Sequence, residues 1–153
     1  MTNTPSSTTP PCSVVYTLRV EFGDCDPAGI VWFPNFFRWI DVASRHFFIE
    51  RGVPPWHETE KTRGLIGTPL VDIHARFIKT TTYGDTLNID VQVVEWREKS
   101  FVQRHRVART NKDGSLDLIM ECDEVRIFAA RREGTDTGIR AIPIPADIKA
   151  LCS

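Results

Sequence analysis

The sequence lacks the cysteine and histidine spacings that mark metal sites and disulfide frameworks. Its four cysteines form no Cys-x-x-Cys pair, and its four histidines form no His-x-x-x-His pair. Structural zinc sites and redox-active disulfides both depend on short spacings of this kind. We therefore expect no bound metal, no other cofactor and no disulfide framework.

Long apolar runs and an excess of basic residues are also missing. No stretch approaches the ~20 apolar residues that a membrane-spanning helix needs. The formal net charge is -1, which leaves no surplus of Lys and Arg to neutralise nucleic-acid phosphates. Residues 1–11 are rich in Thr, Ser and Pro, without the basic-then-apolar order of a signal peptide. We expect a flexible arm over residues 1–13, a cytoplasmic protein, and neither membrane nor nucleic acid as a partner.

The chain does contain enough apolar residues for one domain of ordinary size. It has 153 residues, of which 41% are hydrophobic and 25% are charged, as is typical of globular proteins. No internal repeat and no linker-like change of composition interrupts it. Residues 14–153 are therefore expected to form a single domain.

The longest predicted element is an apolar helix that begins at Pro34. Proline suits the first helical position, because the N–H that it lacks would have no partner there. Apolar residues then recur with helical spacing at Phe36, Ile40, Ala43 and Phe47. Other apolar residues widen this stripe, which predicts a helix covered on several sides. Gly52 provides the stop, so the helix should run about 18 residues.

Strands are predicted for much of the remaining sequence. Alternating polarity and β-branched or aromatic residues indicate them at residues 14–22, 70–78, 87–93, 101–109, 118–130 and 139–142. A break in the alternation near Asp123 and Glu124 predicts a β-bulge. We expect residues 56–67 to form a loop with some helical turn, and residues 145–151 to form a terminal helical turn.

The order of these elements predicts the fold class. A first strand leads to one long helix, and the later strands are joined by short turns, so helix and strands are segregated along the chain. This order is typical of an α+β domain with an antiparallel sheet. Because the single helix is apolar around most of its circumference, we expect the sheet to curl around it.

The turn between the first strand and the helix holds the candidate chemistry. Residues 21–35 read Glu-Phe-Gly-Asp-Cys-Asp-Pro-Ala-Gly-Ile-Val-Trp-Phe-Pro-Asn. Pro27 restricts the backbone of Asp26, and Gly29 allows a ligand to approach the main chain closely. A fixed carboxylate beside the unsatisfied N–H donors of a helix N-terminus suits attack on a carbonyl.

Other interpretations of this turn compete with that one. Asp24 and Asp26 could be ordinary turn residues that bond to local N–H groups, and the pattern alone favours this. Asp-x-Asp after a strand also occurs in phosphohydrolases that form an aspartyl phosphate, but these need a parallel βαβ sheet instead of hairpins. Cys25 could be a thiol nucleophile, yet no histidine is marked out as its base, and a small buried cysteine is more common.

The turn and later segments resemble a known family. Asp-x-Asp-Pro-Ala-Gly-Ile-Val at 24–31 is typical of the hot-dog-fold thioesterase superfamily. Similarity to its 4-hydroxybenzoyl-CoA thioesterases continues in Gly-Val-Pro-Pro-Trp (52–56), Gly-Thr-Pro (67–69), Glu-Trp-Arg-Glu-Lys-Ser-Phe-Val-Gln-Arg-His (95–105) and Arg-Ala-Ile (140–142). The resemblance covers nearly the whole chain beyond residues 1–15. It implies a hot-dog fold, in which an antiparallel sheet wraps around one long central helix.

The resemblance also implies roles for individual residues. Asp26 matches the catalytic carboxylate, which acts as nucleophile or as general base toward water. The backbone N–H of Phe33 matches the donor that polarises the thioester carbonyl, an interaction worth ~3 kcal/mol in the transition state. The family usually has Tyr there, but the contribution comes from the main chain. Asp41 and Thr68 match positions that recognise a ring hydroxyl, although by themselves they would be an exposed helix charge and a loop residue.

Three basic residues match positions that hold the phosphates of coenzyme A, namely Arg97, Lys99 and Arg140. The sequence departs from the family pattern at two nearby positions. Glu98 stands where the family tends to have Arg, and Gly138 replaces another basic residue. A carboxylate beside phosphates is unfavourable, so nucleotide binding is expected to be weaker than in the family or rearranged.

The activity implied by the resemblance is hydrolysis of an aroyl-CoA thioester, such as 4-hydroxybenzoyl-CoA or another hydroxylated benzoyl-CoA, in the degradation of aromatic compounds. It further implies active sites at a dimer interface and assembly to a homotetramer. Two alternatives stay open. One is a thioesterase for aliphatic or other aromatic acyl-CoA substrates, and the other is a domain that binds acyl-CoA without catalysis.

Overall fold

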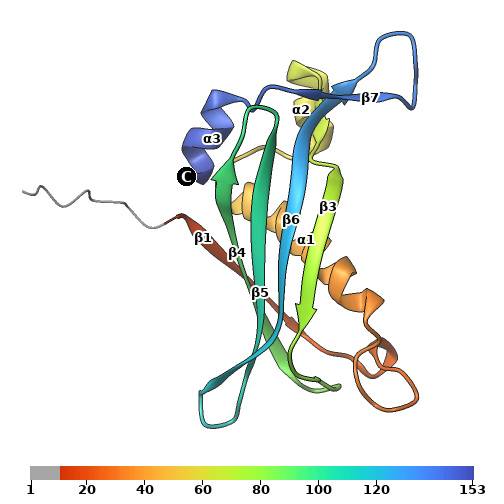
Figure 1. Ribbon diagram of the computed structural model, residues 1–153, viewed down its shortest axis with the longest axis vertical. Coiled ribbons are helices and arrows are strands. Elements are labelled where there is room, and N and C mark those ends of the chain that lie inside the picture. The colour runs from red at the N-terminus through yellow and green to blue at the C-terminus, as the bar shows by residue number, and fades with distance from the viewer. Residues whose placement is uncertain (1–10) are drawn as a thin grey trace, which may run out of the picture.

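A computed structural model describes residues 11–153 and contains a seven-stranded sheet over that range (Figure 1). Its strands are β1 (Ser13–Arg19), β2 (Leu65–Gly67), β3 (Leu70–Phe77), β4 (Thr86–Trp96), β5 (Ser100–Thr110), β6 (Leu116–Arg131) and β7 (Ile139–Ile142). The helices are α1 (Pro34–Glu50), α2 (Trp56–Arg63) and α3 (Ala146–Cys152), and a 3₁₀ turn, η1, covers Phe22–Asp24. Within residues 11–153, no helix has the length and apolar character needed to cross a membrane.

The sheet is antiparallel at each of its strand pairs. Its order is β1-β4-β5-β6-β2, and β3 and β7 also pair with β6. Helix α1 lies across one face of the sheet (Figure 1), with β1 and β4 among its contacts. The predicted α+β class and the long central helix are therefore confirmed.

Helix α1 is buried along the stripe that the sequence predicted. Its residues Phe36, Ile40, Ala43 and Phe47 are at most 5% exposed. The helix has 17 residues and ends at Glu50, close to the predicted length. Gly52 follows with φ of +87°, a left-handed conformation that favours glycine and ends the helix as expected.

Phe48 anchors the helix at an aromatic cluster, and we expect its loss to weaken the fold strongly. Its ring centroid lies 5.3–6.0 Å from those of four other aromatic residues. Phe48→Ala should lower the free energy of unfolding by ~4 kcal/mol, because it leaves a cavity in a packed core. Urea denaturation at a fixed protein concentration measures this loss. Ile49→Ala is the control, since Ile49 is 41% exposed. Equal losses in the two variants would contradict the prediction.

Two predicted boundaries near the N-terminus are wrong. Strand β1 begins at Ser13, and Cys12 packs against the core, so the arm predicted for residues 1–13 extends too far. Residues 1–10 of that arm lie outside the described residues. Strand β1 also ends at Arg19 instead of residue 22. The reason is local: Phe22–Asp24 turns into the 3₁₀ segment η1, where the Glu21 N–H donates to the Asp24 carboxylate at 2.9 Å.

The predicted loop over residues 56–67 contains more regular structure than expected, since it holds α2 and β2. Helix α2 has no apolar stripe that periodicity could reveal. Its buried Thr59 instead donates a hydrogen bond to the carbonyl of Leu65 at 2.7 Å, which ties the helix to β2. Tertiary contacts therefore stabilise α2 and β2, which the local sequence pattern did not predict.

The β-bulge predicted near Asp123 and Glu124 is also wrong. Strand β6 keeps its alternation there, and Cys122, Glu124, Arg126 and Phe128 all lie on the buried face. The register of β6 against β5 instead shifts at Ile119. The apolar pattern broke because two buried positions of the strand carry charged side chains.

Candidate active site

The loop before α1 holds Asp26 in a closed turn. Its N–H donates to the carbonyl of Ile30 at 2.8 Å, and its carbonyl accepts from the N–H of Gly29 at 2.9 Å. Its carboxylate Oδ1 accepts from the Ala28 N–H at 2.9 Å. Gly29 has φ of +80°, which a residue with a side chain rarely adopts. Over residues 11–153 no hydrogen bond occupies the other carboxylate oxygen of Asp26, so that oxygen is available to a substrate or a water.

Asp24, two residues earlier, ties the loop to the helix. Its carbonyl accepts from the Trp32 N–H at 2.9 Å and from the Asn35 side-chain amide at 2.8 Å. Its carboxylate accepts from Arg38 at 3.2 Å. These bonds hold the segments 24–26 and 30–32 side by side. Asp24 thus supports the geometry of the loop, whereas Asp26 offers a carboxylate oxygen.

Phe33 is the N-cap of α1, and its side chain is exposed. The next N–H groups of the helix start are taken, because Asn35 donates to Trp32 and Phe36 donates to Phe33. Pro34 has no N–H. In the described part of the chain no partner accepts the Phe33 N–H, which therefore remains a free donor at the positive end of the helix dipole. The short loop thus presents a free carboxylate oxygen and a free main-chain donor.

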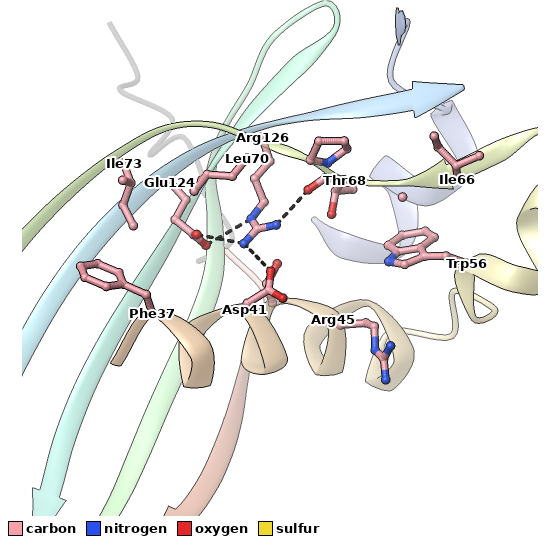
Figure 2. A pocket seen from close by; sticks show the side chains of 13 residues that line it. Phe37, Asp41, Arg45, Trp56, Ile66, Thr68, Leu70, Ile73, Glu124 and Arg126 are labelled. Carbon is pink, nitrogen blue, oxygen red and sulfur yellow. Dashed lines mark hydrogen bonds and ion pairs between the residues drawn. The ribbon is translucent and has the colours of Figure 1, made fainter. Parts of the chain in front are cut away.

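A pocket of about 670 Å³ opens between α1 and the strands β3 and β6 (Figure 2). It is lined by apolar side chains that include Phe37, Trp56 and Ile73, together with the polar residues Asp41 and Thr68. Asp41 and Thr68, which are 27 positions apart in the sequence, thus line the same pocket. Asp26 and Phe33 do not line it: Asp41 lies two helical turns beyond Phe33, ~12 Å along the axis.

Two buried charged residues of this pocket were missed by the sequence analysis, Glu124 and Arg126. They are 2% and 5% exposed. Arg126 donates to Glu124 at 2.9 and 3.2 Å, to the Thr68 carbonyl at 2.9 Å and to Asp41 at 3.1 Å (Figure 2). Burial raises the pKa of the Glu124 carboxyl, and the charge of Arg126 opposes that shift. The signal that could have found them was the break in the apolar pattern of the β6 sequence, at positions where the burial of the strand still alternates.

The pocket floor continues into further buried polar residues. Ser44 donates to the side-chain carbonyl of Gln103. His105 is fully buried, with Nδ1 3.4 Å from a Glu124 carboxylate oxygen. Burial, followed by the charge of Arg126, lowers the pKa of His105 to about 3, so this imidazole is neutral near pH 7. A neutral imidazole leaves Arg126 as the buried cation beside Glu124.

The basic residues predicted to hold coenzyme A belong to elements at the same end of the sheet (Figure 1). Arg97 and Lys99 belong to the β4–β5 turn, and Arg140 lies on β7. The Ile144 N–H donates to the Glu98 carbonyl at 3.0 Å, which brings that turn beside the segment after β7. Arg97 is not free, because its guanidinium bonds to both carboxylate oxygens of Glu95 at 3.0 and 3.1 Å.

The Asp26 loop lies at the opposite end of the sheet (Figure 1). Its Val31 N–H donates to the Thr81 carbonyl at 3.0 Å, and Thr82 donates to the Gly29 carbonyl. Both threonines precede β4, whereas Arg97 follows it. Strand β4 has 11 residues, or ~36 Å at the usual rise. Within a single chain, the predicted catalytic carboxylate and the predicted phosphate-binding residues therefore lie far apart.

Comparison with known proteins defines the class. The family model of the thioesterase-like superfamily matches residues 20–151, and the chain belongs to that superfamily. It is 52% identical over 141 residues to the 4-hydroxybenzoyl-CoA thioesterase of Pseudomonas sp. (strain CBS-3), a match that covers 92% of this chain and 98% of the relative.

Two solved structures extend the comparison. One is a mutant 4-hydroxybenzoyl-CoA thioesterase complexed with 4-hydroxybenzoyl-CoA, with 50% identity, a TM-score of 0.87, and coverage of 92% of this chain and 99% of that chain. The other is a gentisyl-coenzyme A thioesterase, with 30% identity, a TM-score of 0.73, and coverage of 89% and 99%. The predicted hot-dog fold and the predicted enzyme class, a thioesterase, are therefore confirmed.

Proposed function

We propose that this chain hydrolyses 4-hydroxybenzoyl-CoA, or another hydroxylated benzoyl-CoA, to the free acid and coenzyme A in the cytoplasm. The carboxylate of Asp26 attacks the thioester carbonyl or deprotonates the water that does so. The Phe33 N–H donates to the carbonyl oxygen as negative charge develops on it, which lowers the barrier.

The pocket between α1 and β3 is the observation that carries this proposal. An aromatic acyl group needs apolar walls, and a ring hydroxyl needs polar partners at one point of them. Phe37, Trp56 and Ile73 line the pocket, while Asp41 and Thr68 supply the polar groups. The 52% identity to a 4-hydroxybenzoyl-CoA thioesterase supports the same acyl group.

For the coenzyme A portion we propose Arg97, Lys99 and Arg140 as the phosphate-binding residues. Three cationic side chains on elements at the same end of the sheet suit a ligand that carries several phosphates. Glu98 lies within this group, and Glu95 already occupies Arg97. We therefore expect Lys99 and Arg140 to contribute more to phosphate binding than Arg97 does.

A homodimer explains how residues from opposite ends of the sheet can serve one substrate. The outer edge of β3 has no strand partner among the described residues, and Leu70, Val71 and Phe77 are about half exposed on it. Two copies that pair antiparallel along β3, about a two-fold axis, would form a self-complementary interface. Two such dimers would give the homotetramer that the family resemblance implies.

That pairing also assembles the site. Phe77 lies near the start of α1, with its ring centroid 5.6 Å from that of Phe36, whereas Leu70 lines the pocket. Antiparallel pairing sets the Phe77 end of one copy beside the Leu70 end of the other. The Asp26 loop of one copy thus faces the pocket and the basic end of its partner.

The substrate is tested by thiol release from a panel of thioesters. We expect kcat/KM for 4-hydroxybenzoyl-CoA to exceed that for benzoyl-CoA by at least ~100-fold, because a site built to bind a hydroxyl leaves its polar groups unpaired when the hydroxyl is absent. An aliphatic acyl-CoA serves as the third substrate. Equal rates with all three would overturn hydroxyl recognition, and binding without thiol release would mean a non-catalytic acyl-CoA-binding domain.

A further inference from the structure

We infer that Arg126 is a positioning residue that sets selectivity for the ring hydroxyl, by fixing Asp41 and the Thr68 main chain in one arrangement. This inference rests on the proposed function. Arg126 itself is 5% exposed and reaches the pocket from β6, on the opposite wall from α1 (Figure 2). It acts through the residues that it holds, and it takes no part in the chemical step.

The geometry of the guanidinium supports this role. It donates four hydrogen bonds at once: two to Glu124, one to the Thr68 carbonyl and one to Asp41. A planar group with four bonds in fixed directions has one orientation. The Asp41 side chain, in contrast, is 74% exposed and would otherwise sample several rotamers. Arg126 therefore gives an exposed carboxylate a single direction.

The bond to Asp41 leaves part of the carboxylate for a ligand. Arg126 bonds to Oδ1, and no residue of the described range donates to the second oxygen. A hydroxyl that enters the pocket can donate to that oxygen. Thr68 is held through its carbonyl, so its side chain is placed by the same guanidinium. Both candidate hydroxyl partners thus depend on one arginine.

Glu124 is the counter-ion that allows Arg126 to be buried. An arginine this deeply buried needs a counter-charge, since an unpaired buried charge is strongly destabilising. Glu124 is 2% exposed and supplies that charge from the same strand, two residues away. Asp41 is consequently free to serve a ligand, because it is not the principal counter-ion of Arg126.

Arg126→Lys tests the inference while it keeps the buried positive charge. Lysine is a point charge that cannot bridge three acceptors in a plane. We expect the ratio of kcat/KM for 4-hydroxybenzoyl-CoA to that for benzoyl-CoA to fall at least ~10-fold, because only the hydroxylated substrate uses the groups that Arg126 positions. The control is Arg104→Lys, which breaks a similar two-bond pair with Asp123 that does not line the pocket.

A double-mutant cycle separates positioning from general support of the fold. If Arg126 acts through Asp41 and Thr68, adding Arg126→Lys to Asp41→Ala/Thr68→Ala lowers the selectivity ratio by less than ~2-fold beyond Asp41→Ala/Thr68→Ala alone. Three results would each overturn the inference: an equal fall of kcat/KM for both substrates in Arg126→Lys, an unchanged selectivity ratio in that variant, or additive effects of the substitutions on the ratio. If the lysine variant does not fold, Glu124→Gln/Arg126→Gln removes both buried charges together, and the same loss of selectivity is expected.

Affinities distinguish this inference from the proposed function. In an Asp26→Asn background, calorimetry compares binding of 4-hydroxybenzoyl-CoA and benzoyl-CoA with and without Arg126→Lys. We expect the lysine substitution to reduce the affinity ratio at least ~10-fold as well. If the wild-type protein releases no thiol from any aroyl-CoA, the proposed function fails, yet the affinity ratio still decides the role of Arg126. Equal affinities for 4-hydroxybenzoyl-CoA and benzoyl-CoA, both in Asp26→Asn and in Asp26→Asn/Arg126→Lys, would overturn the inference.

Discussion

Asp26→Asn is expected to abolish thioester hydrolysis while the fold is retained. The asparagine side-chain carbonyl can still accept the hydrogen bond that Asp26 Oδ1 accepts from the Ala28 N–H, so the turn should keep its shape. The amide has no charge with which to attack a carbonyl or to deprotonate water. We expect kcat to fall by roughly 10³–10⁴-fold, measured as thiol release from 4-hydroxybenzoyl-CoA.

Asp24→Asn is the matched control for that variant. Asp24 has the same side chain in the same loop, but its carboxylate is engaged by Glu21 and Arg38. We expect kcat to change by less than ~10-fold, because the loss concerns support of the loop and an exposed ion pair. Near-normal turnover by Asp26→Asn, or equal losses in both variants, would contradict the catalytic assignment.

The second large effect is the rescue of activity when two inactive variants are mixed. One variant is Asp26→Asn, and the other is Lys99→Glu/Arg140→Glu, which puts negative charge where phosphates should bind. In the proposed dimer, each site takes Asp26 from one copy and the basic residues from its partner. Half of randomly mixed dimers then contain one intact site of two, so about a quarter of wild-type activity should return.

The measurement uses the two variants refolded together, with thiol release assayed at limiting substrate. Each variant refolded alone is the control and should remain nearly inactive. If all groups of a site came from one chain, every site in the mixture would still lack either the carboxylate or the basic residues. Absence of rescue, with mixed dimers present by mass spectrometry, would therefore exclude the shared site.

Much of the fold could be predicted from local periodicity. Helix α1 has its apolar stripe and its proline and glycine boundaries in sequence, and β4 alternates without interruption from Leu87 to Val93. Local patterns do not predict the elements in which tertiary contacts override them. Helix α2 is polar and depends on Thr59, and β6 places Glu124 and Arg126 on a face that apolar periodicity assigns to hydrophobic residues.

The candidate site divides in the same way. The shape of the Asp26 loop could be predicted because its proline, glycine and helix start are contiguous and act locally, whereas family resemblance singled out Asp26 within it. Asp41 and Thr68 meet only after α1 packs over the sheet, and family resemblance, not periodicity, singled them out. The break in the apolar pattern of β6 marked its buried charges, but it did not indicate that Arg126 bonds to Asp41 and Thr68, because these partners lie far from it in the sequence.

The open edge of β3 has a consequence for the isolated chain. An edge strand with unpaired main-chain groups and half-exposed Leu70, Val71 and Phe77 is a template for uncontrolled strand addition. Dimerisation along β3 would cover this exposed edge and complete the active site at the same time. Substitutions that weaken dimerisation should therefore produce insoluble protein before they produce soluble, inactive monomers, so expression yield and assembly are expected to fall together.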